Sequence, residues 1–240
     1  MRMTPYAWSV TANTTRSDAS QPPVPPTSAP DVPVPAPYSP IGRIPVIEVF
    51  PVVEDGRWPA KAVPGEVIPI RATVFREGHD RFGATAVLVR PDGTDGPSAR
   101  MYEIAAGLDR YEARLAPDTP GDWGLRVEGW SDPYATWRHD AAVKVGAGVD
   151  VELMLEEGAR LMERAAAGNA FHNPSQRPPS DADIEALHDA ARRLRDSSHS
   201  PQQRLSAGIS SRIRLIFRDH PLRDLLDSSR VYPLDVARTK

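Results

Sequence analysis

The sequence predicts a β + α two-domain protein: an immunoglobulin-like β-sandwich followed by a small antiparallel helical bundle, with a disordered proline-rich N-terminal tail. Three observations support this prediction. Ten of the 26 prolines lie in residues 1–40, short β-type segments fill residues 41–149, and an apolar period of three to four residues begins at residue 150. The predicted regions are 1–40 for the tail, 41–149 for the sandwich, 150–230 for the bundle and 231–240 for a truncated return to the sandwich.

The tail contains the proline-rich segment "QPPVPPTSAPDVPVPAPYSP". Each proline lacks a backbone N–H and has a fixed φ, so neither a helix nor a strand ladder can form here. The segment also has too little apolar surface to offset the entropy lost on ordering. We therefore expect a disordered spacer with polyproline II character. The alternative is an adaptor protein, in which the tail docks into an aromatic groove of a partner.

Seven segments after the tail have the composition of short strands. In "EVIPIRATVF" the apolar residues Ile68, Ile70 and Ala72 alternate with Pro69 and Arg71, which predicts one buried face. The connections are rich in Gly, Pro and Asp, the residues that turns require. Seven strands without a helical period between them are typical of an immunoglobulin-like sandwich. The segments are residues 46–53, 66–75, 83–90, 99–104, 110–116, 122–130 and 135–145.

The helical region has recognisable start signals. Asp150 is placed to cap a first helix. Ser180 with Asp183, and Ser200 with Gln203, have the spacing of capping boxes at the start of two more helices. Apolar residues recur at three and four positions after each start, so an antiparallel bundle is expected.

Composition excludes several classes of function. The chain has no cysteine, which excludes disulfides and thiolate ligands, and its net charge of −3 gives it no general affinity for nucleic acid or anionic lipid. No apolar run is long enough to cross a membrane, so a cytoplasmic protein with no membrane partner is expected. No H-x-x-x-H, G-x-S-x-G or strand–glycine loop–helix pattern occurs. We therefore expect no cofactor, no metal site and no catalytic residue.

Two short clusters combine charges, imidazoles and aromatic rings: "FREGHD" and "SDPYATWRHD". Such residues are found at catalytic centres, but they are also typical of strand ends, where Asp forms turns and aromatic side chains fill the core. A β-sandwich by itself rarely supplies a water-excluded cleft, so we interpret both clusters as interface or rim elements. The candidate residues are Arg76, His79, Asp80, Asp132, Tyr134, Trp137, Arg138 and His139.

These residues also carry a family resemblance. The run "RIPVIEVFPVVEDGRWPAKAVPGEVIPIRATVFREGHD" resembles the start of the maltosyltransferases that extend α-1,4-glucan from α-maltose 1-phosphate. "DPYATWRHD", "VKVGAGVDVELMLEEGARLMERAA" and "HPLRDLLDSSRVYPLDV" are similar to later segments of the same enzymes. The similarity covers about residues 43–236, which is the whole chain apart from the tail.

The resemblance implies a β-sandwich N domain and a helical S domain that precede an α-amylase-type catalytic barrel. It also implies homodimers to which these domains contribute. No residue here matches a catalytic position of the family, so the chain is expected to be inactive alone, as a truncated or split-gene product. Its expected function is a structural and dimerisation scaffold in α-glucan metabolism. The expected partners are a second copy or a separately encoded barrel.

The alternative is a free-standing module that binds α-glucan. Aromatic side chains on a sandwich can stack on sugar rings, although buried core tryptophans look the same in sequence. The aromatic residues in question are Trp58, Trp123, Trp130, Tyr134 and Trp137.

Overall fold

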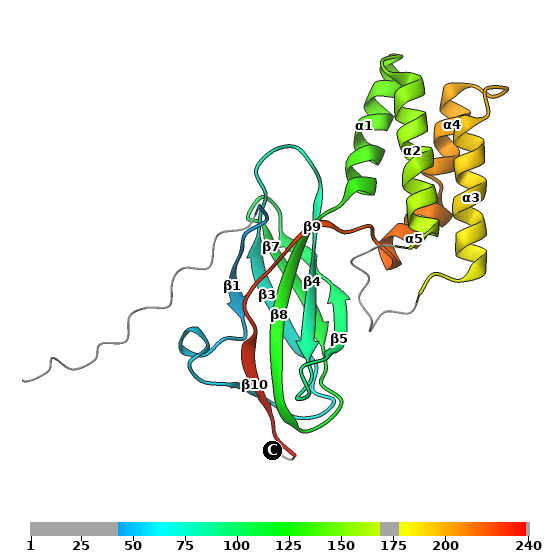
Figure 1. Ribbon diagram of the computed structural model, residues 1–240. Helices are drawn as coiled ribbons and strands as arrows, with labels where there is room; N and C mark the ends of the chain where they lie inside the picture. Colours follow the sequence, from blue (N-terminus) through cyan, green and yellow to red (C-terminus); the bar gives the residue numbers. More distant parts are fainter. Residues whose placement is uncertain (1–42, 169–177, 239–240) are drawn as a thin grey trace, which may run out of the picture. The chain divides into compact units, whose positions relative to one another are not determined.

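The structure, a computed structural model, describes residues 43–168 and 178–238, so the predicted tail over residues 1–40 lies outside the described residues. The chain divides into two units, 1–39 and 40–240, and every element below belongs to the second. In the described residues two β-sheets and a group of helices are present (Figure 1). The elements are β1 (Val46–Phe50), the 3-10 helix η1 (Glu54–Gly56), β2 (Ala60–Ala62), β3 (Ile68–Val74), β4 (Phe82–Val89), β5 (Asp95–Arg100), β6 (Tyr102–Ala105), β7 (Arg110–Leu115), β8 (Gly121–Ser131), α1 (Pro133–Ala147), α2 (Val151–Ala166), α3 (Asp181–Arg195), α4 (Pro201–Gly208), α5 (Ser211–Asp219), β9 (Asp224–Ser228) and β10 (Tyr232–Val236).

The two sheets share one hydrophobic core. One has four strands in the order β1-β3-β7-β6, and the other has six, in the order β2-β10-β8-β4-β5 with β9 paired to β8. Strand β3 buries Ile68, Ile70, Ala72 and Val74, as the alternation in its sequence predicts. These side chains belong to the same cluster as Leu125 of the second sheet.

The segment "ATWRHDAAVKV", predicted to be a strand, is part of helix α1. Asp132 caps this helix and Pro133 occupies its first turn, where the missing N–H costs no hydrogen bond. Trp137, Ala141 and Val145 recur every four residues and are buried. The Thr, Trp and Val residues of the segment favour strands and obscured this helical period. The helices therefore begin at α1 and not at α2.

The helices bury a second hydrophobic core of their own. The capping boxes predicted at Ser180 with Asp183 and at Ser200 with Gln203 are confirmed at the starts of α3 and α4. Asp150 occupies the N-cap position of α2, as predicted, but it has a left-handed φ of 51° and its side chain makes no capping hydrogen bond. No helix in the described part of the chain combines the length and the apolar character that a membrane span needs.

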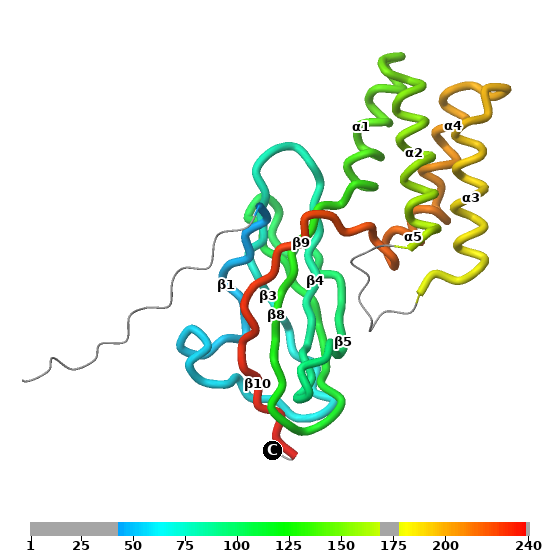
Figure 2. Tube along the Cα trace, viewed as in Figure 1, coloured from blue at the N-terminus to red at the C-terminus, as the bar shows by residue number. Residues whose placement is uncertain are grey.

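Strands β9 and β10 return the chain from the helices to the six-stranded sheet (Figures 1 and 2). In β9, Asp224 lies opposite Ser131 of β8, and Ser228 lies opposite Glu128. Strand β10 lies between β8, to which it is antiparallel, and β2, to which it is parallel. The bundle predicted over residues 150–230 needs correction, because its end is strand. Within the predicted return over residues 231–240, strand β10 has a neighbour on each side.

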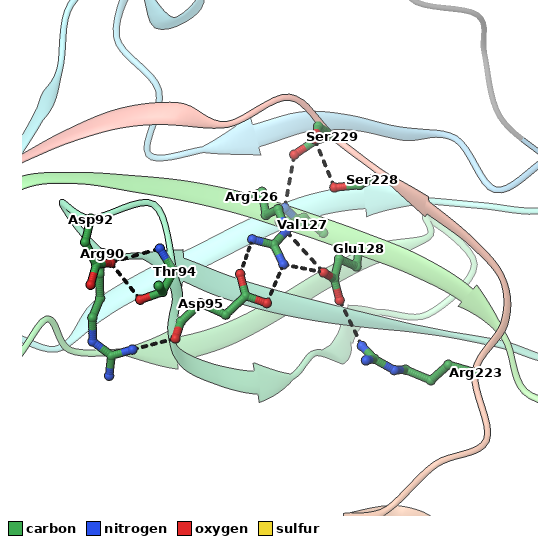
Figure 3. A network of polar contacts seen from close by, with 10 residues as sticks. All are labelled: Arg90, Asp92, Thr94, Asp95, Arg126, Val127, Glu128, Arg223, Ser228 and Ser229. Carbon is green, nitrogen blue, oxygen red and sulfur yellow. Dashed lines mark hydrogen bonds and ion pairs between the residues drawn. The ribbon is translucent and has the colours of Figure 1, made fainter. Parts of the chain in front are cut away.

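A network of charged side chains joins β5, β8 and the segment before β9 (Figure 3). The Arg126 guanidinium donates to both carboxylate oxygens of Asp95, at 2.6 and 2.8 Å, and to Glu128 Oε1 at 2.8 Å. Arg223 Nη1 donates to Glu128 Oε2 at 2.9 Å, and the side chains of Arg223 and Glu128 are only 7% and 8% exposed. The hydrogen bonds from Arg126 lower the pKa of Asp95. Glu128 therefore connects the sheet to the returning segment.

Candidate functional site at the sheet–helix junction

The two predicted clusters, "FREGHD" and "SDPYATWRHD", meet where β8 ends and α1 begins, and we call this place the junction. The Asp132 N–H donates to the Arg81 carbonyl at 2.9 Å. The Arg76 guanidinium donates to the Ser131 hydroxyl and, at 2.6 Å, to the Asp80 carboxylate. The sequence predicted both clusters separately, and the structure brings them together.

Asp132 has a structural role at the junction. Its Oδ1 accepts from the Ala135 N–H at 2.8 Å, which caps α1. Its Oδ2 accepts from Arg100 Nη2 at 3.0 Å, and the Arg100 guanidinium lies 4.9 Å from the centre of the Trp130 ring. Both oxygens of this buried carboxylate are therefore occupied by fold-forming contacts.

Tyr134 and Trp137 are core residues, and their assignment to a rim needs correction, because each is only 4% exposed. The Tyr134 ring stacks on Phe217 with a centroid distance of 3.9 Å, and its hydroxyl donates to the Gly208 carbonyl at 3.1 Å. Burial raises the pKa of Tyr134 to about 12. Trp137 Nε1 donates to the Met154 carbonyl at 2.6 Å. The apolar period of α1 directs both rings into the helical core, so that little of either ring is accessible.

His79, Arg138 and His139 are exposed. Arg138 and His139 line a cavity of about 620 Å³ together with Arg81 and Arg214. We call this hollow the basic cavity. The sequence did not point to Arg81 or Arg214, because each lies outside the two clusters and only the fold places it beside α1.

A larger cleft, of about 980 Å³, also borders the junction. Its lining includes the apolar side chains of Trp137, Leu161 and Leu225. Asp80 and Asp224, two of its acidic residues, form ion pairs with arginines that also line it. No group of three or more His, Cys, Asp or Glu among the described residues is arranged to hold a metal ion.

A comparison with family models identifies the family of this chain. Residues 42–238 match the model described as "Alpha-1,4-glucan:maltose-1-phosphate maltosyltransferase, domain N/S". The chain belongs to this family. The resemblance seen in the motifs at the junction is thereby confirmed.

Curated maltosyltransferases match the N/S region as well. The chain is 49% identical over 200 residues to alpha-1,4-glucan:maltose-1-phosphate maltosyltransferase 2 of Streptomyces coelicolor. This alignment covers 83% of the chain and 29% of that protein. It is 36% identical over 229 residues to the Mycolicibacterium smegmatis maltosyltransferase, and this alignment covers 82% of the chain and 31% of that protein. The chain thus spans less than a third of the length of these relatives.

A solved structure, the crystal structure of the Lin-41 filamin domain, aligns with 36% of the chain and 78% of that domain. The sequence identity is 13% and the TM-score is 0.23. This similarity is too low to support an argument about the maltosyltransferase N/S fold.

The tryptophans of this N/S family member are mostly unavailable to a ligand. Trp123, Trp130 and Trp137 are buried in the described structure, as is Tyr134. Trp58 is 54% exposed, and the Arg57 guanidinium lies over its ring, 5.9 Å from the ring centre. The aromatic set that suggested a glucan-binding module is therefore not assembled on one surface.

Proposed function

We propose that residues 43–238 form a non-catalytic scaffold of a maltosyltransferase that extends α-1,4-glucan from maltose 1-phosphate. The observation that carries this proposal is the family match, which spans residues 42–238 but less than a third of each relative. The ionisable side chains at the junction support a structural role. Asp132 caps a helix and binds Arg100, and Arg76 joins Ser131 to Asp80.

We further propose that the two sheets form an immunoglobulin-like sandwich and that the helices form an antiparallel bundle inserted into it. The shared core of the two sheets supports the first part. The second part is supported by the chain path, since β8 leads directly into α1 and the segment after α5 returns to pair with β8. In this arrangement the sandwich comprises residues 46–131 and 224–236, and the bundle comprises residues 133–219.

The purified chain is expected to release no phosphate from maltose 1-phosphate in the presence of glycogen. The reason is that Asp80 and Asp132, two acidic residues of the junction, are already engaged with Arg76, with Arg100 and with the start of α1. Phosphate release and lengthening of the glucan would be measured over time. The Streptomyces coelicolor relative, assayed in parallel, verifies the substrate and the buffer. Turnover by the 240-residue chain alone would contradict the proposal.

We also propose that this scaffold self-associates through the turn between α1 and α2. Val143, Val149 and Leu153 surround this turn and are 61%, 51% and 54% exposed, which is a large exposure for apolar side chains. A second copy would remove this apolar surface from water.

The Leu153→Glu chain is expected to be monomeric at concentrations at which the wild type dimerises, because a carboxylate would be buried in the contact without a partner. Sedimentation velocity over a concentration series measures this difference. Leu108→Glu is the matched control, since Leu108 is 62% exposed on the turn between β6 and β7. A wild-type chain that stays monomeric, or equal dimerisation of both variants, would refute this interface.

A further inference from the structure

The basic cavity combines several cations in one concave place. Its volume is about 620 Å³, which lies within the range of small-molecule sites. Arg81, Arg138, His139 and Arg214 supply its polar lining, and the remaining lining side chains are those of Ala135, Ala142 and Ile209. No acidic side chain is among these lining residues.

The position of Arg81 is fixed by its backbone. Its carbonyl accepts from the Asp132 N–H at 2.9 Å, and its own N–H donates to Thr136 Oγ1 at 2.9 Å. Both partners belong to the start of α1. The connection between β3 and β4 is thereby held against this helix, with Arg81 at the edge of the cavity.

Arg138 and Arg214 are brought together by the ring stack in the helical core. Tyr134 of α1 stacks on Phe217 of α5. Arg138 follows Tyr134 by four residues and Arg214 precedes Phe217 by three, so each lies one turn from the stack on its own helix. The two guanidinium groups therefore line the same cavity because a buried contact beneath them sets the spacing of the helices.

These cations are not neutralised by the protein. Within residues 43–168 and 178–238, no carboxylate forms an ion pair with Arg81, Arg138 or Arg214, and Arg214 Nη2 donates only to the Ser211 hydroxyl, at 3.1 Å. Arg138 and Arg214 also border a neighbouring cavity, whose lining includes Glu103 and Asp132.

Three acidic residues around the basic cavity have other partners in the described structure. Asp132 binds Arg100 and caps α1, and Glu103 accepts from the Gly107 N–H at 3.0 Å. Asp219, two residues after Phe217, pairs with Arg218. Among the described residues that line the hollow, positive charge is therefore not balanced by a carboxylate.

We propose that the basic cavity binds the phosphate group of a small phosphorylated ligand. Guanidinium groups present planar N–H forks that match phosphate oxygens, and several can bind one phosphate at once. The two alanines leave room for the ligand between the arginines. The proposal is independent of the scaffold function, because it requires neither turnover nor a catalytic domain.

Isothermal titration of the full chain with inorganic phosphate, and then with glucose 6-phosphate, tests the site at constant ionic strength. Saturable binding of both phosphate compounds is expected. Glucose, which lacks the phosphate group, is the negative control and is expected not to bind. Arg138→Gln and Arg214→Gln are each expected to weaken phosphate binding by about tenfold or more, because each removes charge-assisted hydrogen bonds. Arg57→Gln is the matched control, since Arg57 is exposed and lies outside the cavity.

Circular dichroism melting of each variant verifies that the fold is intact, which is expected because both cavity arginines are exposed. Amide chemical shifts measured with phosphate provide a second readout and should change around Arg81, Ala135 and Arg214. Equal phosphate affinity in the wild type and both cavity variants would overturn the proposal. Acetate binding as strong as phosphate binding, or shift changes confined to other parts of the chain, would overturn it as well.

Discussion

Replacing Glu128 by glutamine is expected to lower the free energy of unfolding by about 3–5 kcal/mol. Glu128 lies between Arg126 and Arg223 and accepts hydrogen bonds from both. Its side chain and that of Arg223 are nearly inaccessible to water, so little solvent screens the interaction. The amide keeps the size of the carboxylate but removes the charge that both guanidinium groups share.

Thermal and denaturant unfolding measure this effect, and a loss of 3–5 kcal/mol corresponds to a fall in Tm of roughly 10 °C for a domain of this size. Glu185→Gln is the matched control. Glu185 pairs with Arg192 at 3.1 Å, but both side chains are more than half exposed, and such pairs contribute about 0–1 kcal/mol. If Glu128→Gln were as mild as Glu185→Gln, the buried network would have no special role in stability.

A double-mutant cycle isolates the interaction energy between Glu128 and Arg223 from the contributions of their other neighbours. Arg223→Gln combined with Glu128→Gln is expected to destabilise by less than the sum of the two single changes, since each single change already removes the charged contact between Arg223 and Glu128. Strict additivity would mean that the two side chains act independently. The cycle also tests whether the return of the chain to β8 depends on this contact.

Part of the fold could be predicted because its causes are local. The alternation around Ile70 reports a buried strand face directly, and the capping boxes at Ser180 and Ser200 depend on residues three positions apart. The start of α1 was missed although Asp132 and Pro133 form a good helix start. The strand propensity of the following Thr, Trp and Val residues outweighed that local signal.

The candidate site was only partly predictable, because its geometry depends on pairings distant in the sequence. The motif around Trp137 was identified, but its burial requires glycines on two other helices. The basic cavity requires Arg81 and Arg214, which no pattern near Arg138 indicates. Similarly, nothing in the sequence near Glu128 predicts that Arg223 reaches it. Long-range packing determines these features, and single-sequence periodicity contains no information about it.

The Trp137 ring packs directly against two glycines, Gly158 and Gly208. A Cβ on Gly158 of α2 would lie 2.2 Å from Cζ2 of Trp137, and a Cβ on Gly208 of α4 would lie 2.8 Å from its Cη2. The indole cannot easily move away, because its Nε1 donates to the Met154 carbonyl and Trp137 is only 4% exposed. Two glycines within helices, which are normally unfavourable, are therefore required by the ring.

Gly158→Ala is expected to lower the free energy of unfolding by about 1–3 kcal/mol, because the added methyl group overpacks the core. Gly146→Ala is the matched control: Gly146 also lies within a helix, but a Cβ there meets no atom within 4 Å. This control is expected to gain up to about 1 kcal/mol, since alanine favours the helix. The two identical substitutions should thus change stability in opposite directions, as measured by urea unfolding.

A smaller side chain at position 137 should remove the conflict. Trp137→Leu alone is expected to destabilise strongly, because it leaves a cavity and an unpaired Met154 carbonyl. In that background, however, Gly158→Ala is expected to be neutral or stabilising, because the methyl group then fills vacated space. If Gly158→Ala cost the same with leucine at position 137 as with tryptophan, the steric contact with the ring would not be the reason for this glycine.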